Sequence, residues 1–421
     1  MTMASAGDTF WNGFSNMAES LQRGRVVFTS GDGCYLTDRE GKRYFDASGG
    51  LWYNAVGHGR QEIADAIGRQ AASLAACTSF DIYSADVTLA VADRIAALTP
   101  IRDPRVFLTS GGSDSVDSTG KIIRRWFALR GEPERTVMIA REDAYHGMHA
   151  YGTALAGIAA NHDPWGDLVP EVEHITAFNA EALEQRIEEV GAERVAAFFV
   201  EPVIGAGGVF APPEGYLPAV AEVCRRHGVL LVCDEVVTGV GRMGRWTASE
   251  RYGVEPDLMT MAKVLTSGYQ PLGAVVVSGE IAAPFFSGEG AWLKHGYTYS
   301  GHATACAAAM ANLDIIEREG LVERVAELEP ELPRLLGPLA DLDGIEAVRT
   351  AGLLAGVQLD AGWFAEHGVA PARVADEMRD HGQLTRLLAC GALQFSPPFT
   401  TTEEQVAEFA EAVAVSVAAF A

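Results

Sequence analysis

One lysine stands alone in a long uncharged stretch of the chain. Lys263 is the only charged residue between Asp257 and Glu280. An apolar pocket lowers the proton affinity of a lysine, and the neutral amine is a nucleophile toward aldehydes. A surface lysine that keeps its charge in water is the alternative interpretation. The isolation of Lys263 favours a catalytic amine.

An acidic residue closes one of the apolar runs. The run 229–233 is followed directly by Asp234. In a parallel sheet this position lies at the edge where α/β folds bind ligands. A carboxylate there could keep the nitrogen of a heteroaromatic ring protonated. A solvent-facing acid at a strand end is the alternative, because loops commonly carry charge.

Two glycines and a serine form a turn between an apolar run and an amphipathic segment. Gly111, Gly112 and Ser113 follow residues 106–110 and lead into residues 114–129. Glycines let backbone amides approach a ligand, and a new helix offers free N–H groups, which suits a phosphate. A tight turn with Ser113 as the helix N-cap is the alternative. The turn lacks the lysine of a P-loop and the G-x-G-x-x-G pattern, so a nucleotide is disfavoured.

These residues need a scaffold that brings them together. Apolar strand candidates alternate with helical patterns, which indicates an α/β fold with a buried, mainly parallel sheet. The last part is mixed α+β, with one helix expected over residues 321–336. A chain of 421 residues is too long to fold around one compact core, so two or more packed units are expected. We expect an N-terminal segment 1–60 that joins a smaller domain, a large cofactor-binding domain 61–318, and a C-terminal small domain 319–421.

Composition excludes several classes of function. The net charge of −24 argues against nucleic acid and against anionic membrane surfaces. Six scattered cysteines form no C-x-x-C pair, which predicts reduced thiols and a cytoplasmic protein. The N-terminus lacks the features of a signal peptide, and no apolar run is long enough to span a bilayer. His146 and His149 are three residues apart, but no third ligand motif accompanies them, so no metal is expected.

The amine, the acid and the phosphate turn are what a pyridoxal-phosphate site requires. With segments 262–274 and 295–302 and the 29-residue interval from Asp234 to Lys263 (263 − 234), the chain resembles the class III, or omega-type, aminotransferases. The resemblance spans nearly the whole sequence. It implies the pyridoxal-phosphate fold type I, a large domain with a mainly parallel sheet plus a smaller α+β domain from both chain ends.

The resemblance also implies roles for single residues. Lys263 would carry pyridoxal 5'-phosphate as a Schiff base and shuttle a proton, and Asp234 would hold the ring nitrogen protonated. Thr298 would reach the phosphate from a partner subunit, which implies a homodimer with shared active sites. The other cofactor-binding positions that it implies are Gly111, Gly112, Ser113, Tyr145, His146, Glu201, Val236 and Tyr297.

The substrate pocket is similar to that of omega-amino acid–pyruvate transaminases. Trp52 and Phe14 would form walls of the pocket, together with Tyr145; plain core packing is the alternative for Trp52. Arg386 is the candidate for binding a substrate carboxylate, although Leu388 stands where the family's arginine would fall.

The implied reaction moves an amino group from an omega-amino acid or amine to a keto acid, with pyruvate as the expected acceptor, through a pyridoxamine form. A 2,1-aminomutase, a decarboxylating transaminase and a non-catalytic cofactor-binding protein are the alternatives. A mutase needs no keto-acid acceptor and a decarboxylase releases carbon dioxide, so a panel of single substrates separates them.

Overall fold

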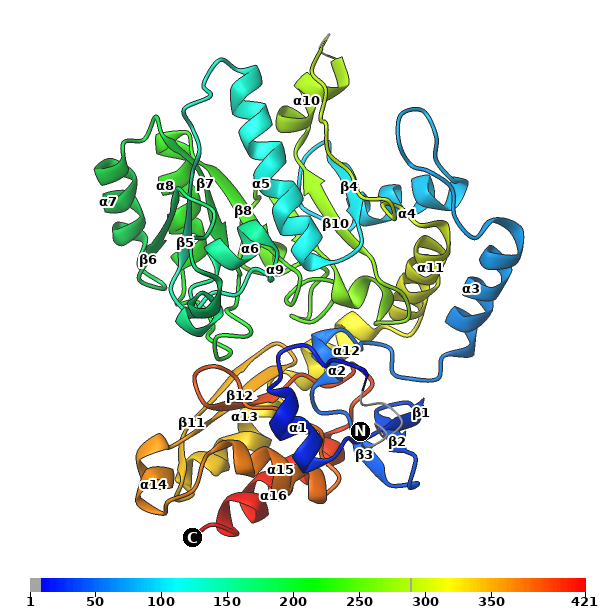
Figure 1. The fold of residues 1–421 in the computed structure, drawn as a ribbon, viewed down its shortest axis with the longest axis vertical. Coiled ribbons are helices and arrows are strands. Elements are labelled where there is room, and N and C mark those ends of the chain that lie inside the picture. The colour runs from blue at the N-terminus through cyan, green and yellow to red at the C-terminus, as the bar shows by residue number, and fades with distance from the viewer. Residues whose placement is uncertain (1–8, 288–289) are drawn as a thin grey trace, which may run out of the picture.

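A mixed sheet forms the centre of the larger part of the molecule (Figure 1). The structure, a computed structural model, describes residues 9–287 and 290–421. Residues 1–8 and 288–289, which the sequence assigns to the small and large domains, lie outside them. Within the described residues the sheet has seven strands, in the order β4 (Arg105–Thr109), β10 (Gly273–Val277), β9 (Leu258–Met261), β8 (Leu230–Asp234), β7 (Val195–Val200), β5 (Val137–Arg141) and β6 (Val172–Ile175).

Strand direction agrees with the expected α/β class and adds one exception. Strands β5 to β9 run parallel to one another. Strand β10 is antiparallel to both β4 and β9, with Val275 opposite Phe107 on one side and Thr260 on the other. The sheet is therefore mostly parallel but mixed, because an apolar run predicts a buried strand without giving its direction.

Helices cover both faces of the sheet. Successive strand residues point to opposite faces. Met138 and Ala140 of β5 therefore pack with α5 (Gly112–Leu129), α6 (Ala150–Leu155) and α10 (Gly279–Ser287). Val137 and Ile139 pack with α7 (Ala180–Val190) and α8 (Tyr216–His227) on the other face. Helices α3 (Gln61–Leu74), α4 (Asp86–Ala97), α9 (Ala248–Arg251) and α11 (Ala303–Arg318) complete the larger part.

The N-terminal segment from residue 9 onward and the last quarter of the chain lie together in the smaller part (Figure 1). Two antiparallel sheets build it, β1 (Phe28–Asp32), β2 (Tyr35–Asp38) and β3 (Arg43–Phe45), then β11 (Ile345–Ala351), β12 (Leu354–Leu359) and β13 (Ala392–Phe395). The expected bounds of the domains stay a prediction. The helices of the smaller part are α1 (Met17–Arg23), α2 (Gly49–Trp52), α12 (Leu321–Leu328), α13 (Glu331–Leu336), α14 (Ala361–Glu366), α15 (Ala372–Asp380) and α16 (Glu403–Ala418).

The single helix expected over residues 321–336 is wrong. Helix α12 ends at Leu328 and α13 begins at Glu331, with Pro330 as its N-cap residue. Proline has no N–H to continue the ladder of the preceding turn, so it ends one helix and starts the next. Pro330 is visible in the sequence, so the break between the two helices could have been predicted from it.

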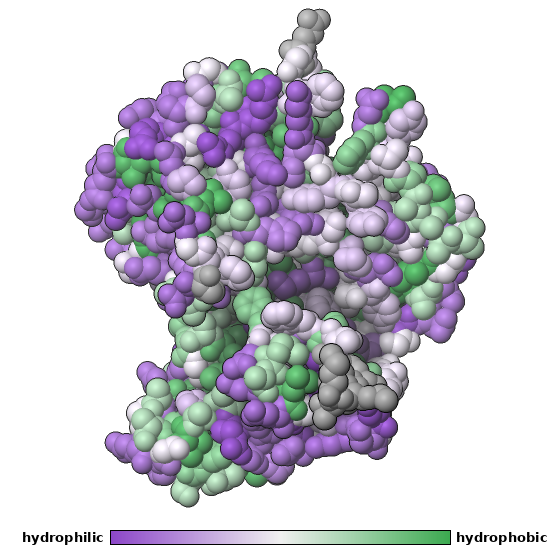
Figure 2. All heavy atoms as spheres, in the orientation of Figure 1, coloured by the Kyte–Doolittle hydropathy of each residue, from purple (hydrophilic) through white to green (hydrophobic). Residues whose placement is uncertain are grey.

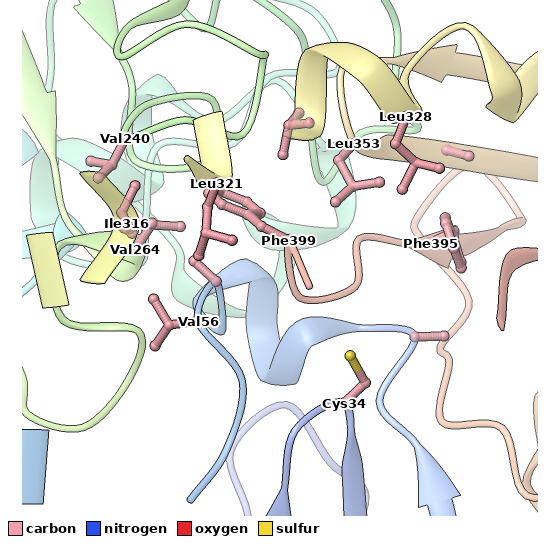
Figure 3. Packing of buried hydrophobic residues seen from close by; sticks show 14 of the residues in the cluster. Cys34, Val56, Val240, Val264, Ile316, Leu321, Leu328, Leu353, Phe395 and Phe399 are labelled. Carbon is pink, nitrogen blue, oxygen red and sulfur yellow. The ribbon is translucent and has the colours of Figure 1, made fainter. Parts of the chain in front are cut away.

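One hydrophobic core joins the two parts. Figure 3 shows Val56, Val264, Leu321 and Phe399 converging from the N-terminal segment, the middle of the chain and its last quarter. Between the parts, the face in Figure 2 has a recess. Among the described residues, no helix combines the length and apolarity needed to cross a bilayer.

Candidate active site

The carboxyl ends of the strands bring the predicted residues to one edge of the sheet. Strands β4, β5, β7, β8 and β9 share one direction, so the segments that follow them meet at the same edge. A cavity of about 440 Å³ lies there, within the usual range for a small-molecule site. The predicted residues that line it are Gly111, Gly112, Ser113, Tyr145, His146, Glu201, Asp234, Val236 and Lys263.

Lys263 follows β9 after one residue and begins the short 3-10 turn Lys263–Thr266. Its φ of 44° is left-handed, a conformation that costs a non-glycine residue about 1–3 kcal/mol and clusters at functional sites. Burial lowers the pKa of the amine from 10.5 to about 8. Asp234 and Glu201 oppose this shift by their charge, whereas Arg386 adds to it. The side chain is thus a desolvated amine, as its isolation in the sequence predicts.

Asp234 is the last residue of β8 and is held by three donors. One carboxylate oxygen is 2.8 Å from His146 Nδ1, and the other accepts bonds from the Thr260 hydroxyl at 2.9 Å and the Val236 amide at 3.1 Å. Burial by itself raises the pKa of Asp234, but the hydrogen bond and charge of His146, with the other donors, bring it below the usual value. The carboxylate therefore stays ionised inside the protein.

Glu201 and Tyr145 complete this end of the cavity. The two oxygens of Glu201 accept the amides of Tyr145 at 2.9 Å and Gly205 at 3.0 Å. Burial raises the pKa of the Glu201 carboxyl and also that of the Tyr145 phenol. His146 Nε2 is buried without a partner among the described residues. Bound water or a ligand group would satisfy it.

The glycine-rich turn ends at the N-terminus of α5. Gly111 is the N-cap residue, so the alternative of Ser113 as N-cap is wrong. The Ser113 hydroxyl instead accepts the Met148 amide at 3.2 Å, which leaves its proton free to be donated. A Cβ on Gly112 would lie 2.8 Å from a methyl of Val236, so this approach requires glycine. The first N–H groups of α5 have no acceptor within the helix and can bind a phosphate.

Trp52 lies beside the lysine on a strained segment. Its φ of 62° is left-handed, and the preceding Gly50 has φ 63°. Asp46 holds this segment by accepting the Gly50 amide at 2.9 Å and by pairing with His58 at 2.9 Å. The Trp52 ring centroid is 5.8 Å from Lys263 Nζ and 4.5 Å from Arg386 Cζ. The indole therefore contacts two cations of the site.

The lysine loop and the tryptophan segment are tied together. The buried Ser267 hydroxyl accepts the backbone amides of Ala55 at 3.2 Å and Val56 at 3.3 Å. Tyr269 donates to the Gly57 carbonyl at 3.1 Å. Through these bonds the loop after Lys263 and the segment after Trp52 hold each other in register.

Five predicted residues do not line the cavity. Trp52 and Arg386 lie next to it, since the Trp52 ring is beside Lys263, and the other three lie elsewhere in this chain. Phe14 does not line the cavity, and 78% of it is exposed. Tyr297 also lies outside the cavity, and its hydroxyl donates to the Asp114 carbonyl at 3.1 Å near the start of α5. Thr298 follows it and is exposed. Their roles at the site stay predictions.

The structure adds residues that the sequence did not single out. Tyr53 lines the cavity, and its ring fills the space that a side chain at Gly268 would need. Thr260 binds Asp234, and Gln394 binds Arg386 at 2.9 Å. Gln394 is a fully buried amide in the short strand β13, and a polar residue inside an apolar run is the signal that could have revealed it.

The residues present fit pyridoxal phosphate. The free N–H groups of α5 suit its phosphate, the ionised and buried Asp234 suits a protonated ring nitrogen, and the desolvated Lys263 suits its aldehyde. The fold and this cavity thus define a pyridoxal-phosphate-dependent enzyme.

Comparison with known proteins is more specific. Residues 17–417 match the family described as aminotransferase class-III, and the chain belongs to that family. It is 35% identical to a beta-alanine–pyruvate aminotransferase of Pseudomonas aeruginosa, over 96% of this chain and 94% of the relative. A putrescine–pyruvate aminotransferase of the same organism is 34% identical, over 94% and 91%. An amine transaminase from an uncultivated Pseudomonas species, solved with pyridoxal phosphate bound, superimposes with a TM-score of 0.93 at 35% identity, over 98% and 99%.

Proposed function

We propose that this aminotransferase moves the amino group of an omega-amino acid or an amine to a keto acid, with pyruvate as the acceptor. The observation that carries the proposal is the position of Arg386. Its guanidinium is partly buried over Trp52, which also contacts Lys263, and no carboxylate within the described residues pairs with it. A guanidinium fork binds a carboxylate well, and both pyruvate and an omega-amino acid carry one. Two relatives named for pyruvate as acceptor support the same substrate class.

Each residue around the lysine has a part in this proposal. Pyridoxal phosphate supplies an aldehyde that binds amines covalently and a ring that accepts electrons. Lys263 would hold the cofactor and then take up and return the proton of the substrate carbon, since an amine with a pKa of about 8 is suited to both steps near neutral pH. Asp234 would keep a proton on the ring nitrogen, because the carboxylate is ionised at that pH.

The surrounding residues would orient the ring. Tyr145, whose burial raises its pKa and keeps it neutral, would offer one aromatic face, and Val236 would press on the other side. Glu201 and His146 would lie along the ring edges, and the amides of Gly111 to Ser113 would hold the phosphate.

We also propose a homodimer in which Thr298 of one subunit reaches the phosphate site of the other. Exposed aromatic side chains near Thr298 support an interface there; Phe80, Trp292 and Tyr299 are each more than half exposed. A hybrid of Lys263→Ala and Thr298→Ala subunits would contain one intact site. Its tight retention of cofactor, relative to Thr298→Ala homodimers, would support the shared site, and a monomer by light scattering would exclude it.

A spectral titration tests the reaction. The yellow holoenzyme is mixed separately with beta-alanine, gamma-aminobutyrate, taurine, putrescine and benzylamine, and then with pyruvate. We expect an amine donor to bleach the visible absorbance and pyruvate to restore it. Lys263→Ala should lose the cycle, whereas Lys121→Ala, a surface lysine, should keep it. Restoration by 2-oxoglutarate but not by pyruvate would contradict the proposed acceptor.

A further inference from the structure

Arg386 lies on a paired segment and not on an open loop. Its carbonyl accepts the Gln394 amide at 3.0 Å, and the Leu388 amide donates to the Ala392 carbonyl at 2.8 Å. Residues 386–388 and 392–394 thus form a small hairpin around Gly391, whose φ of 87° suits the turn. The backbone of Arg386 is held directly against strand β13.

The side chain of Arg386 is held as well. Its Nε donates to Gln394 Oε1 at 2.9 Å, and its guanidinium lies over the Trp52 ring. Gln394 in turn donates from Nε2 to the Ser48 carbonyl at 3.2 Å and to the Ser396 hydroxyl at 2.6 Å. These acceptors hold the amide nitrogen and so fix which end of the amide faces the arginine. Because Gln394 is fully buried, it has no water to replace a lost partner.

We propose that Gln394 is a positioning residue that fixes Arg386 as a stationary carboxylate anchor, so that the enzyme favours amino donors with a carboxylate over uncharged amines. This inference rests on the proposed function. Gln394 occupies the Nε edge of the guanidinium and leaves the two terminal nitrogens for the substrate. A carboxylate can then pair with both terminal nitrogens without any movement of the arginine.

An uncharged amino donor binds less favourably beside the same fixed cation. Its apolar tail would lie against a partly buried guanidinium that has no carboxylate partner among the described residues. Moving Arg386 aside would break its bond to Gln394, remove the contact with Trp52 and leave a buried amide oxygen without a donor. The hairpin further restricts this movement.

Steady-state kinetics of the holoenzyme with beta-alanine and with benzylamine, each at saturating pyruvate, test the anchor. In Gln394→Met we expect kcat/KM for beta-alanine to fall about tenfold, mainly through a higher KM. This is about the effect of losing one hydrogen bond to a charged group. The value for benzylamine should stay the same or rise. Gln394→Glu keeps an acceptor for Arg386 Nε, but its carboxylate offsets the positive charge of the guanidinium. This variant should therefore also lose preference for beta-alanine over benzylamine. Gln185→Met on the exposed face of helix α7 is the control and should change neither donor.

A double-mutant cycle separates positioning from general damage. If Gln394 acts through Arg386, Gln394→Met should have no further effect on beta-alanine in an Arg386→Met background. An equal loss for both donors in Gln394→Met, or a full additional loss in the Arg386→Met background, would overturn the proposal while transamination itself persists. If the wild-type protein transaminates none of the five donors of the spectral titration, the proposed function fails, and the anchor fails with it.

Discussion

The desolvated Lys263 predicts how fast the apoprotein takes up its cofactor at each pH. The neutral amine is the form that reacts with an aldehyde. At pH 7 an amine with a pKa of about 8 is neutral in about 9% of molecules, against about 0.03% for an amine with the ordinary value of 10.5. The structure thus predicts attachment about 300-fold faster at pH 7 than for an exposed lysine, other factors being equal.

Stopped-flow absorbance of the apoprotein mixed with pyridoxal phosphate, from pH 6 to pH 10, measures this rate. We expect the rate to rise about tenfold per pH unit and to level off above about pH 8. Asp234→Asn removes the carboxylate that raises the pKa of Lys263, so its plateau should begin at lower pH. Arg386→Met removes a cation that lowers the pKa, so its plateau should begin at higher pH.

A rate that continues to rise tenfold per unit up to pH 10 would refute this reasoning, because it would mean that Lys263 titrates as an exposed lysine. Borohydride reduction followed by peptide mapping identifies the modified residue. Attachment to any other side chain would also contradict the assignment. Lys121→Ala serves as the control and should follow the wild-type profile.

Three further predictions concern stability and cofactor retention. Because the folded pKa of Lys263 is lowered, the unfolded chain binds more protons between pH 8 and 10.5, so the unfolding free energy of the wild-type apoprotein should rise by about 3 kcal/mol across that window relative to Lys263→Met in urea titrations. Gly112→Ala should weaken cofactor retention on dialysis about tenfold, roughly 1.4 kcal/mol, since its Cβ overlaps a neighbouring valine, whereas Gly111→Ala, with open space, should not. Ser267→Ala should lower the unfolding free energy by about 1–3 kcal/mol, because two buried amides lose their acceptor. An unchanged urea midpoint would contradict this last prediction.

The chemistry-bearing residues were the most predictable part of the molecule. Lys263 and Asp234 have local signals, a lone cation in an apolar stretch and an acid at a strand end, and both line the same cavity. The α/β class also followed from alternating apolar runs and helical patterns. Such features depend on nearby residues, which is why the sequence alone can indicate them.

Other features depend on contacts between distant residues. The direction of β10, the partners of Arg386 and the ring of Tyr53 in the cavity arise from packing of segments far apart in the chain. The place of Phe14 at a pocket wall comes from the resemblance alone and stays a prediction, because its exposed side chain lies outside the cavity of the single chain. The helix break at Pro330 was visible in the sequence, and only the apolar periodicity on either side obscured it.

The hydrogen bonds of Ser267 to residues 55 and 56 have a consequence for chimeric enzymes. These bonds join the segment that carries Trp52 to the loop that begins at Lys263, so either segment exchanged with a relative arrives without its matching half. A transplant of residues 46–58 alone would shift the lysine loop along with the indole. Donor preference would therefore transfer between relatives only when residues 46–58 and 263–270 are exchanged together in one chimera.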